Sequence, residues 1–193
     1  MASVPDTVIY GCGNVLLGDD GFGPAVISLL KTHGLPEGVK ARDVGTSIRE
    51  ILFDLVLDPR LAPRKLIVVD SVDMADMAPG EIKIIRPGEI PAIKLHDFSL
   101  HQFPTVNLLA ELAENTKTDV FIVAAQVERL PTEISPGLSR KVTEAVWLAS
   151  KLILERFIHA PIKFSVKNPL VESPKTHCAF MGFESFEKVR EVT

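Results

Sequence analysis

Residues 9–24 read IYGCGNVLLGDDGFGP and combine an apolar strand, closely spaced glycines and two adjacent carboxylates ahead of a helix. A dinucleotide-binding loop needs a third glycine three residues after its second, where helix and strand pack closely. Leu16 occupies that position here. Asp19 and Asp20 stand where a phosphate would bind, and like charge repels it. The stretch therefore suits a cation better than a nucleotide.

Strands and helices alternate along the rest of the chain. The strands are expected at residues 7–10, 39–44, 65–70, 81–86 and 119–125. The first, third and fifth are continuous apolar runs, as in strands covered on both faces, whereas the alternation over 81–86 fits a half-exposed edge strand. This order predicts an α/β fold: a mostly parallel, twisted five-stranded sheet with helices on both faces and one antiparallel edge strand.

The expected helices show apolar residues at helical spacing. One begins at Phe22, a second covers Ile48–Leu57, and a third follows Pro104. The last is expected from about Pro136 to Ile158, with Ser135 as its N-cap. Its buried face should consist of Val142, Ala145, Val146, Ala149, Leu152 and Ile153. We expect a single domain over residues 1–159 and assign no role to the proline-interrupted extension, 160–193.

Composition excludes several classes of protein. The 193 residues are 46% hydrophobic, enough for a sizeable core, and the net charge of −4 gives no nucleic-acid footprint. No apolar run reaches the roughly 18 residues of a membrane span, and no secretory leader is visible. Cys12 and Cys178 form no metal knuckle or disulfide framework. We expect a cytoplasmic protein without a membrane or nucleic-acid partner, in which Cys12 is a small buried residue.

Several polar residues should gather at one rim of the sheet, because ligands of open α/β sheets bind at the carboxyl ends of the strands. The expected rim residues are Asp19, Asp20, Gly45, Thr46, Asp70, Asp73, Asp76, His96, Asp97, His101, Gln102, Gln126 and Glu128. Two carboxylates and an imidazole from separate loops could bind a divalent metal, since imidazole suits nickel and zinc.

Each candidate also has a purely structural interpretation. Asp19 or Asp20 could cap the following helix, where acidic residues are favoured. Asp70 could cap a turn, and His101 could be an ordinary hydrogen-bonded histidine. Turn and solvated-loop roles are the simplest interpretation of Gly45, Thr46, Asp73 and Asp76. From the residues alone, the sequence supports a possible metal-binding α/β domain.

Four motifs in order resemble a known family. The run from Gly11 to Gly23 is similar to the N-terminal signature of hydrogenase maturation endopeptidases. The family's glycine–threonine turn, its strand ending in Asp and its histidine motif have counterparts at 43–46 (DVGT), 68–72 (VVDSV) and 99–102 (SLHQ). The resemblance covers roughly residues 6–158.

This resemblance implies an endopeptidase that trims the C-terminal peptide of a [NiFe]-hydrogenase large-subunit precursor after nickel insertion. The resemblance implies that Asp20, Asp70 and His101 contact nickel and are the catalytic residues. Asp19 is the alternative to Asp20. Some members carry Glu at the first position, one methylene longer than Asp20. The nickel belongs to the precursor, so no stored metal is expected. Residues 97–105 look most like members serving coenzyme F420-reducing hydrogenases.

The sequence favours direct attack by water on the scissile peptide, because it offers no convincing nucleophile. Cys12 is expected inside a strand end, and no serine lies in a G-x-S-x-G elbow. Nickel could lower the pKa of that water, or it could position the substrate while a carboxylate acts as general base. Two alternatives remain: a non-catalytic chaperone for the immature hydrogenase, and a nucleotide-binding α/β enzyme.

Overall fold

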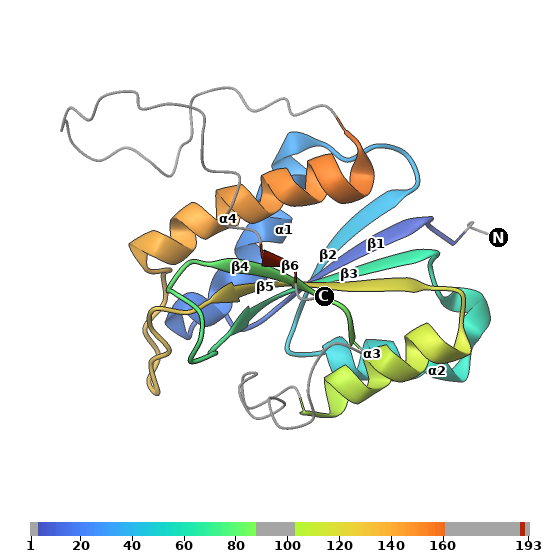
Figure 1. Ribbon diagram of the computed structural model, residues 1–193, viewed down its shortest axis with the longest axis horizontal. Coiled ribbons are helices and arrows are strands. Elements are labelled where there is room, and N and C mark those ends of the chain that lie inside the picture. Colours follow the sequence, from blue (N-terminus) through green and yellow to red (C-terminus); the bar gives the residue numbers. More distant parts are fainter. Residues whose placement is uncertain (1–3, 88–102, 161–189, 192–193) are drawn as a thin grey trace.

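A computed structural model describes residues 4–87, 103–160 and 190–191. Its sheet has the strand order β2-β1-β3-β5-β4-β6, with helices on both faces (Figure 1). The strands are β1 (Thr7–Cys12), β2 (Val39–Gly45), β3 (Lys65–Val72), β4 (Ile82–Ile85), β5 (Asp119–Gln126) and β6 (Arg190–Glu191). Strands β2, β1, β3 and β5 run parallel, and β4 is antiparallel to β5. The expected fold class is confirmed, and the two-residue β6 adds a parallel neighbour to β4.

The central strands extend further at their carboxyl ends than expected. Strand β3 continues past Asp70 because Asp70 and Ser71 pair with Ala124 and Ala125 of β5. Asp70 therefore lies within a paired strand and does not cap a turn. Asp70 is buried there, and a buried polar group needs hydrogen-bond or charge partners.

In the described part of the chain, four α-helices cover the sheet: α1 (Phe22–His33), α2 (Ile48–Leu57), α3 (Phe103–Asn115) and α4 (Arg140–Leu152). Helices α1 and α4 pack together on one face, and α2 and α3 on the other (Figure 1). Each face has its own apolar cluster, one containing Phe22 and Ile153 and the other Leu52 and Leu109. No helix within the described ranges is both long and apolar enough to cross a membrane.

The expected start of the last helix is wrong. Helix α4 begins at Arg140, and its N-cap is Ser139, whose hydroxyl accepts a hydrogen bond from the Val142 N–H (3.3 Å). Gly137 has φ 102°, a value incompatible with a helix, so the preceding residues form a loop. The expected buried face is confirmed, with Leu152 partly buried, and a π-helical turn, Ile153–Ile158, follows. Residues 161–189, with Cys178, lie outside the described part, so the boundary at 159 stays a prediction.

The glycines of residues 11–23 allow close packing of backbone on backbone. A Cβ at Gly23, in the first turn of α1, would collide with the carbonyl oxygen of Cys12. A Cβ at Gly13, where φ is 120°, would collide with the carbonyl oxygen of Asp20. The spaces that a nucleotide-binding loop keeps for phosphate are filled by the chain itself. This packing seats the 3-10 turn Gly18–Gly21, and with it both aspartates, against the end of β1.

Candidate functional site

Asp20 and Asp70 meet at the carboxyl ends of β1 and β3, joined by Ser71. The Ser71 N–H donates to Asp70 Oδ1 (2.8 Å), and the Ser71 hydroxyl donates to Asp20 Oδ1 (3.2 Å). All three residues are buried, with 5% or less of their surface exposed. The parallel pairing of β1 with β3 places the two segments side by side. Two of the three predicted ligands therefore converge.

The second oxygen of Asp20 is held by the glycine-rich loop. The Asn14 N–H donates to Asp20 Oδ2 (2.7 Å), and the Asn14 side chain accepts from the Leu16 N–H (3.0 Å). Asp20 thus has one donor on each oxygen. Among the described residues, hydrogen bonds to Asp70 involve Oδ1 alone. Its other oxygen is the one with free acceptor capacity toward a bound cation.

Electrostatics at this site favour a positive ligand. Burial raises the pKa of Asp70 well above its usual range, and the nearby Asp20 carboxylate raises it further, against the opposing effect of the Ser71 N–H. Two buried like charges without a positive partner are unfavourable, and a divalent cation between them removes that cost. Carboxylate oxygens, with imidazole, suit a borderline metal such as nickel.

Cys12, the last residue of β1, is confirmed as a buried residue, 1% exposed. Burial raises the pKa of its thiol well above normal, and the charges of Asp70, Asp43 and Asp20 raise it further. A thiol in such surroundings stays protonated and is a poor nucleophile. We expect the Cys12→Ala variant to retain trimming activity within about threefold, at a stability cost of about 1 kcal/mol for the lost packing. A mass-spectrometric trimming assay checks this, and loss of all cleavage by the folded variant would identify a thiol mechanism.

The third predicted ligand, His101, lies outside the described residues, as do His96, Asp97 and Gln102. Among the residues that the structure does describe, no three His, Cys, Asp or Glu side chains lie close enough to hold a metal. Asp20 and Asp70 supply two carboxylates, and a further ligand must come from elsewhere. The role of His101 stays a prediction.

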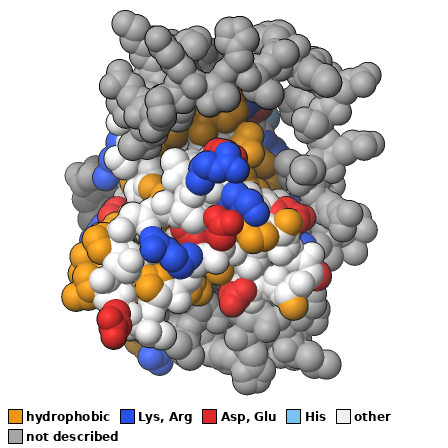
Figure 2. Space-filling view, turned by 90° about the vertical axis from the view of Figure 1, so that its left-hand side faces the viewer, with side chains coloured by type: hydrophobic (Ala, Val, Ile, Leu, Met, Phe, Trp, Pro, Cys, Tyr) orange, Lys and Arg blue, Asp and Glu red, His pale blue; other side chains and the backbone are white. Residues whose placement is uncertain are grey.

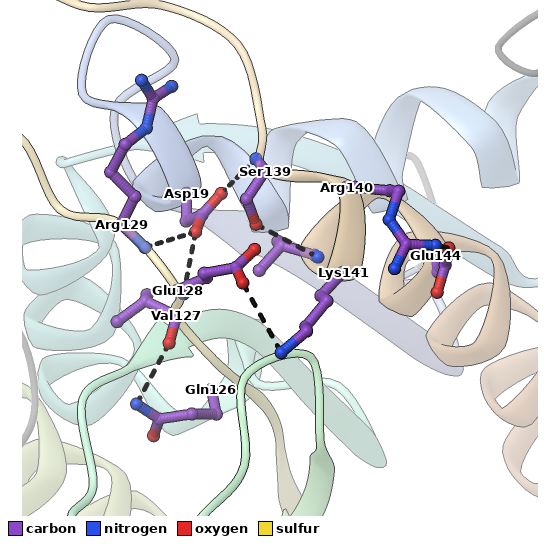
Figure 3. A network of polar contacts seen from close by, with 10 residues as sticks. Asp19, Gln126, Val127, Glu128, Arg129, Ser139, Arg140, Lys141 and Glu144 are labelled. Atoms are coloured by element: carbon purple, nitrogen blue, oxygen red, sulfur yellow. Dashed lines mark hydrogen bonds and ion pairs between the residues drawn. The ribbon is translucent and has the colours of Figure 1, made fainter. Parts of the chain in front are cut away.

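The Asp19 side chain lies between the loop after β5 and the start of α4 (Figure 3). Its Oδ2 accepts from the N–H groups of Glu128 (2.9 Å) and Arg129 (2.7 Å), and its Oδ1 accepts from the Ser139 N–H (2.6 Å). The capping interpretation is wrong for both aspartates, because α1 begins after Gly21 without a side-chain cap. Asp19 instead holds the loop between β5 and α4, and both of its oxygens are occupied.

Other rim residues have supporting roles. The Gln126 side chain accepts from the Met74 N–H (2.7 Å) and donates to Asp73 Oδ1 (3.0 Å), which fixes the loop after β3. Glu128 forms an ion pair with Lys141 (3.5 Å). The turn at Gly45 is confirmed, since its φ is 53°. The sequence alone could not predict the hydrogen bonds of the Ser71 and Gln126 side chains, because neither pattern nor spacing shows where a single side chain points.

The face at which β3 and β5 end carries basic and acidic side chains close together, with hydrophobic side chains around them (Figure 2). A nucleic-acid-binding face has clustered positive charge instead. The loop after β1 exposes the apolar side chains of Val15 and Leu16, and the loop between β5 and α4 exposes those of Leu130 and Ile134. The loops touch, because the Ser135 N–H donates to the Leu16 carbonyl (2.9 Å).

Comparison with known proteins gives consistent results. A family model described as hydrogenase maturation protease matches residues 24–156. The chain is 41% identical over 150 residues to a putative hydrogenase maturation protease of Methanocaldococcus jannaschii, covering 77% of this chain and 94% of the relative. It is 32% identical over 155 residues to the coenzyme F420 hydrogenase subunit delta of Methanothermobacter thermautotrophicus, covering 78% and 93%.

The fold is similar to a solved structure as well. The hydrogenase maturating endopeptidase HybD from Escherichia coli superposes with a TM-score of 0.64 at 28% sequence identity, covering 77% of this chain and 90% of that one. The family match at residues 24–156 includes β2, β3, β4 and β5, whereas β1 and the turn that carries Asp20 precede it. The family resemblance of the sequence therefore agrees with the sequence and fold comparisons.

Proposed function

The chain belongs to the hydrogenase maturation protease family, and on that premise we propose that it removes the C-terminal peptide of a [NiFe]-hydrogenase large-subunit precursor once nickel has been inserted. Nickel is carried by the substrate, and the protein recognises it through Asp20, Asp70 and His101. The convergence of two buried carboxylates, joined by Ser71 and without a positive partner among the described residues, carries this proposal.

The carboxylates have two tasks in the reaction. They hold the nickel-bearing end of the precursor so that its scissile peptide lies beside a water molecule, and positioning of this kind can contribute about 7–11 kcal/mol in favourable models. A carboxylate oxygen of the pair that does not bind nickel accepts a proton as the water oxygen bonds to the peptide carbonyl carbon. The C–N bond then breaks, and the proton passes to the departing amine. Nickel supplies positive charge at this centre.

Mass spectrometry of the nickel-loaded precursor tests the proposal. The wild-type protein should shorten the precursor at one position, and metal-free precursor should remain uncut. Asp20→Asn and His101→Ala should each lower the rate at least about 100-fold, the lower limit typical of a lost acid–base or positioning group. Asp54→Asn, which removes an exposed carboxylate from α2, is the matched control.

Three results would contradict the proposal. A complex with the precursor that forms without any loss of mass would favour a chaperone. A triple variant at positions 20, 70 and 101 that trims normally would place the chemistry elsewhere. Stoichiometric metal retained by the purified free protein would argue against recognition of substrate-borne nickel.

We also propose which class of hydrogenase supplies the precursor. The resemblance of residues 97–105 and the likeness to an F420 hydrogenase delta subunit favour a coenzyme F420-reducing hydrogenase. Trimming assays with large-subunit precursors of different hydrogenase classes would decide. The cytoplasmic location remains a prediction, which cell fractionation would test.

A further inference from the structure

We propose that Ser71 is a positioning residue that fixes Asp20 relative to Asp70, so that both carboxylates face one cation. This inference rests on the proposed function, since it concerns the same pair of carboxylates. Ser71 donates a hydrogen bond to each aspartate: its N–H donates to Asp70 Oδ1, and its hydroxyl donates to Asp20 Oδ1.

The hydroxyl is the only part of the Ser71 side chain that bonds to an aspartate, because the bond to Asp70 comes from the Ser71 backbone N–H. Asp70 and Ser71 are held in β3 by pairing with β5, so the N–H bond to Asp70 persists with any side chain at position 71. Asp20 lies in a 3-10 turn outside the sheet. Its carboxylate is fixed by two donors, the Asn14 N–H on Oδ2 and the Ser71 hydroxyl on Oδ1. Without the hydroxyl, one donor remains and the carboxylate can rotate.

Repulsion between the aspartates makes this second donor necessary. The two carboxylates are buried and interact electrostatically, and repulsion would turn Asp20 away from Asp70 when no cation is present. A hydroxyl between them opposes that rotation. Residues that orient metal ligands in this way typically change metal affinity or activity 10–100-fold when mutated.

The test compares Ser71→Ala with Ser150→Ala. Ser150 is an equally buried serine whose hydroxyl donates to the Val146 carbonyl (2.8 Å) within α4, on the face that carries α1. We expect Ser71→Ala to lower kcat for nickel-loaded precursor about 10–100-fold with KM changed less than about threefold. Ser150→Ala should keep both constants within about twofold, although it removes the same group. The two variants should have similar melting temperatures.

A conservative variant separates positioning from packing. Ser71→Thr retains a hydroxyl, and we expect it to regain most of the lost kcat. If its extra methyl group prevents folding, Ser71→Cys fills the same space with a weak donor and should fall between wild type and Ser71→Ala. Wild-type kinetics for folded Ser71→Ala would overturn the inference, as would equal loss in Ser71→Ala and Ser150→Ala. Absence of trimming by the wild type would instead contradict the proposed function.

Discussion

The Asp70→Asn variant is expected to melt at a higher temperature than the wild-type protein and to leave nickel-loaded precursor uncut. Asn keeps the acceptor for the Ser71 N–H but removes a buried negative charge beside Asp20. We expect a gain of about 1–2 kcal/mol in the free energy of unfolding at pH 7, in the range of stabilising substitutions at functional sites. For a chain of this length, that raises the melting temperature by about 2–8 °C. Trimming should fall at least about 100-fold.

The stability gain should depend on pH. Because burial and Asp20 raise the pKa of Asp70 in the folded protein, the folded state binds the proton more tightly than the unfolded chain, where the pKa is about 3.9. The wild-type protein therefore benefits from Asp70 in acid and loses that benefit as the pH rises through the raised pKa. Asn does not titrate. The difference in melting temperature should be small near pH 4 and grow toward neutral pH.

Thermal melts from pH 4 to pH 8 measure this difference, with Asp54→Asn as the control for loss of an exposed charge. The control should show little change at any pH. A lower melting temperature for Asp70→Asn at pH 7 would mean that the carboxylate stabilises the fold, and the electrostatic account of the site would then be wrong.

Much of the fold could be predicted because local pattern decides it. The apolar runs of β1, β3 and β5, and the bounds of α2 at Ile48–Leu57, follow from periodicity alone. The start of α4 could not be predicted from Ser135 and Pro136. That loop is fixed by contacts with residues over a hundred positions earlier, at Leu16, Gly18 and Asp19.

Part of the site could be predicted from the expected strand order. Topology brings the ends of β1 and β3 together, so the nearness of Asp20 and Asp70 follows from strand order. The different roles of Asp19 and Asp20 do not, because the two adjacent side chains of a 3-10 turn point in different directions. Sequence alone could not show which of them accepts backbone N–H groups and which faces Asp70.

Substitution of Asp19 should have the opposite effect to substitution of Asp70. Asp19→Ala leaves the N–H groups of Glu128, Arg129 and Ser139 without their acceptor in a partly buried setting. Each lost hydrogen bond to a charged acceptor costs about 1.5–3 kcal/mol in ordinary cases. We expect a total loss of about 4 kcal/mol or more, which lowers the melting temperature by roughly 8–16 °C.

Asp19→Asn should lie between wild type and Asp19→Ala. Its single carbonyl oxygen can replace Oδ2 and keep two of the three bonds, whereas its NH₂ group then faces the Ser139 N–H, donor against donor.

Glu128→Gln is the control for loss of a carboxylate near this loop. It breaks only the half-exposed ion pair to Lys141 and should cost less than about 1 kcal/mol. Folded Asp19→Asn should still trim precursor within about threefold of wild type, since among the described residues the hydrogen bonds of the Asp19 side chain go to Glu128, Arg129 and Ser139 and not to the proposed nickel-binding pair. Equal melting temperatures for Asp19→Ala and wild type would contradict the structural role, and lost trimming in stable, folded Asp19→Asn would move Asp19 into the nickel site.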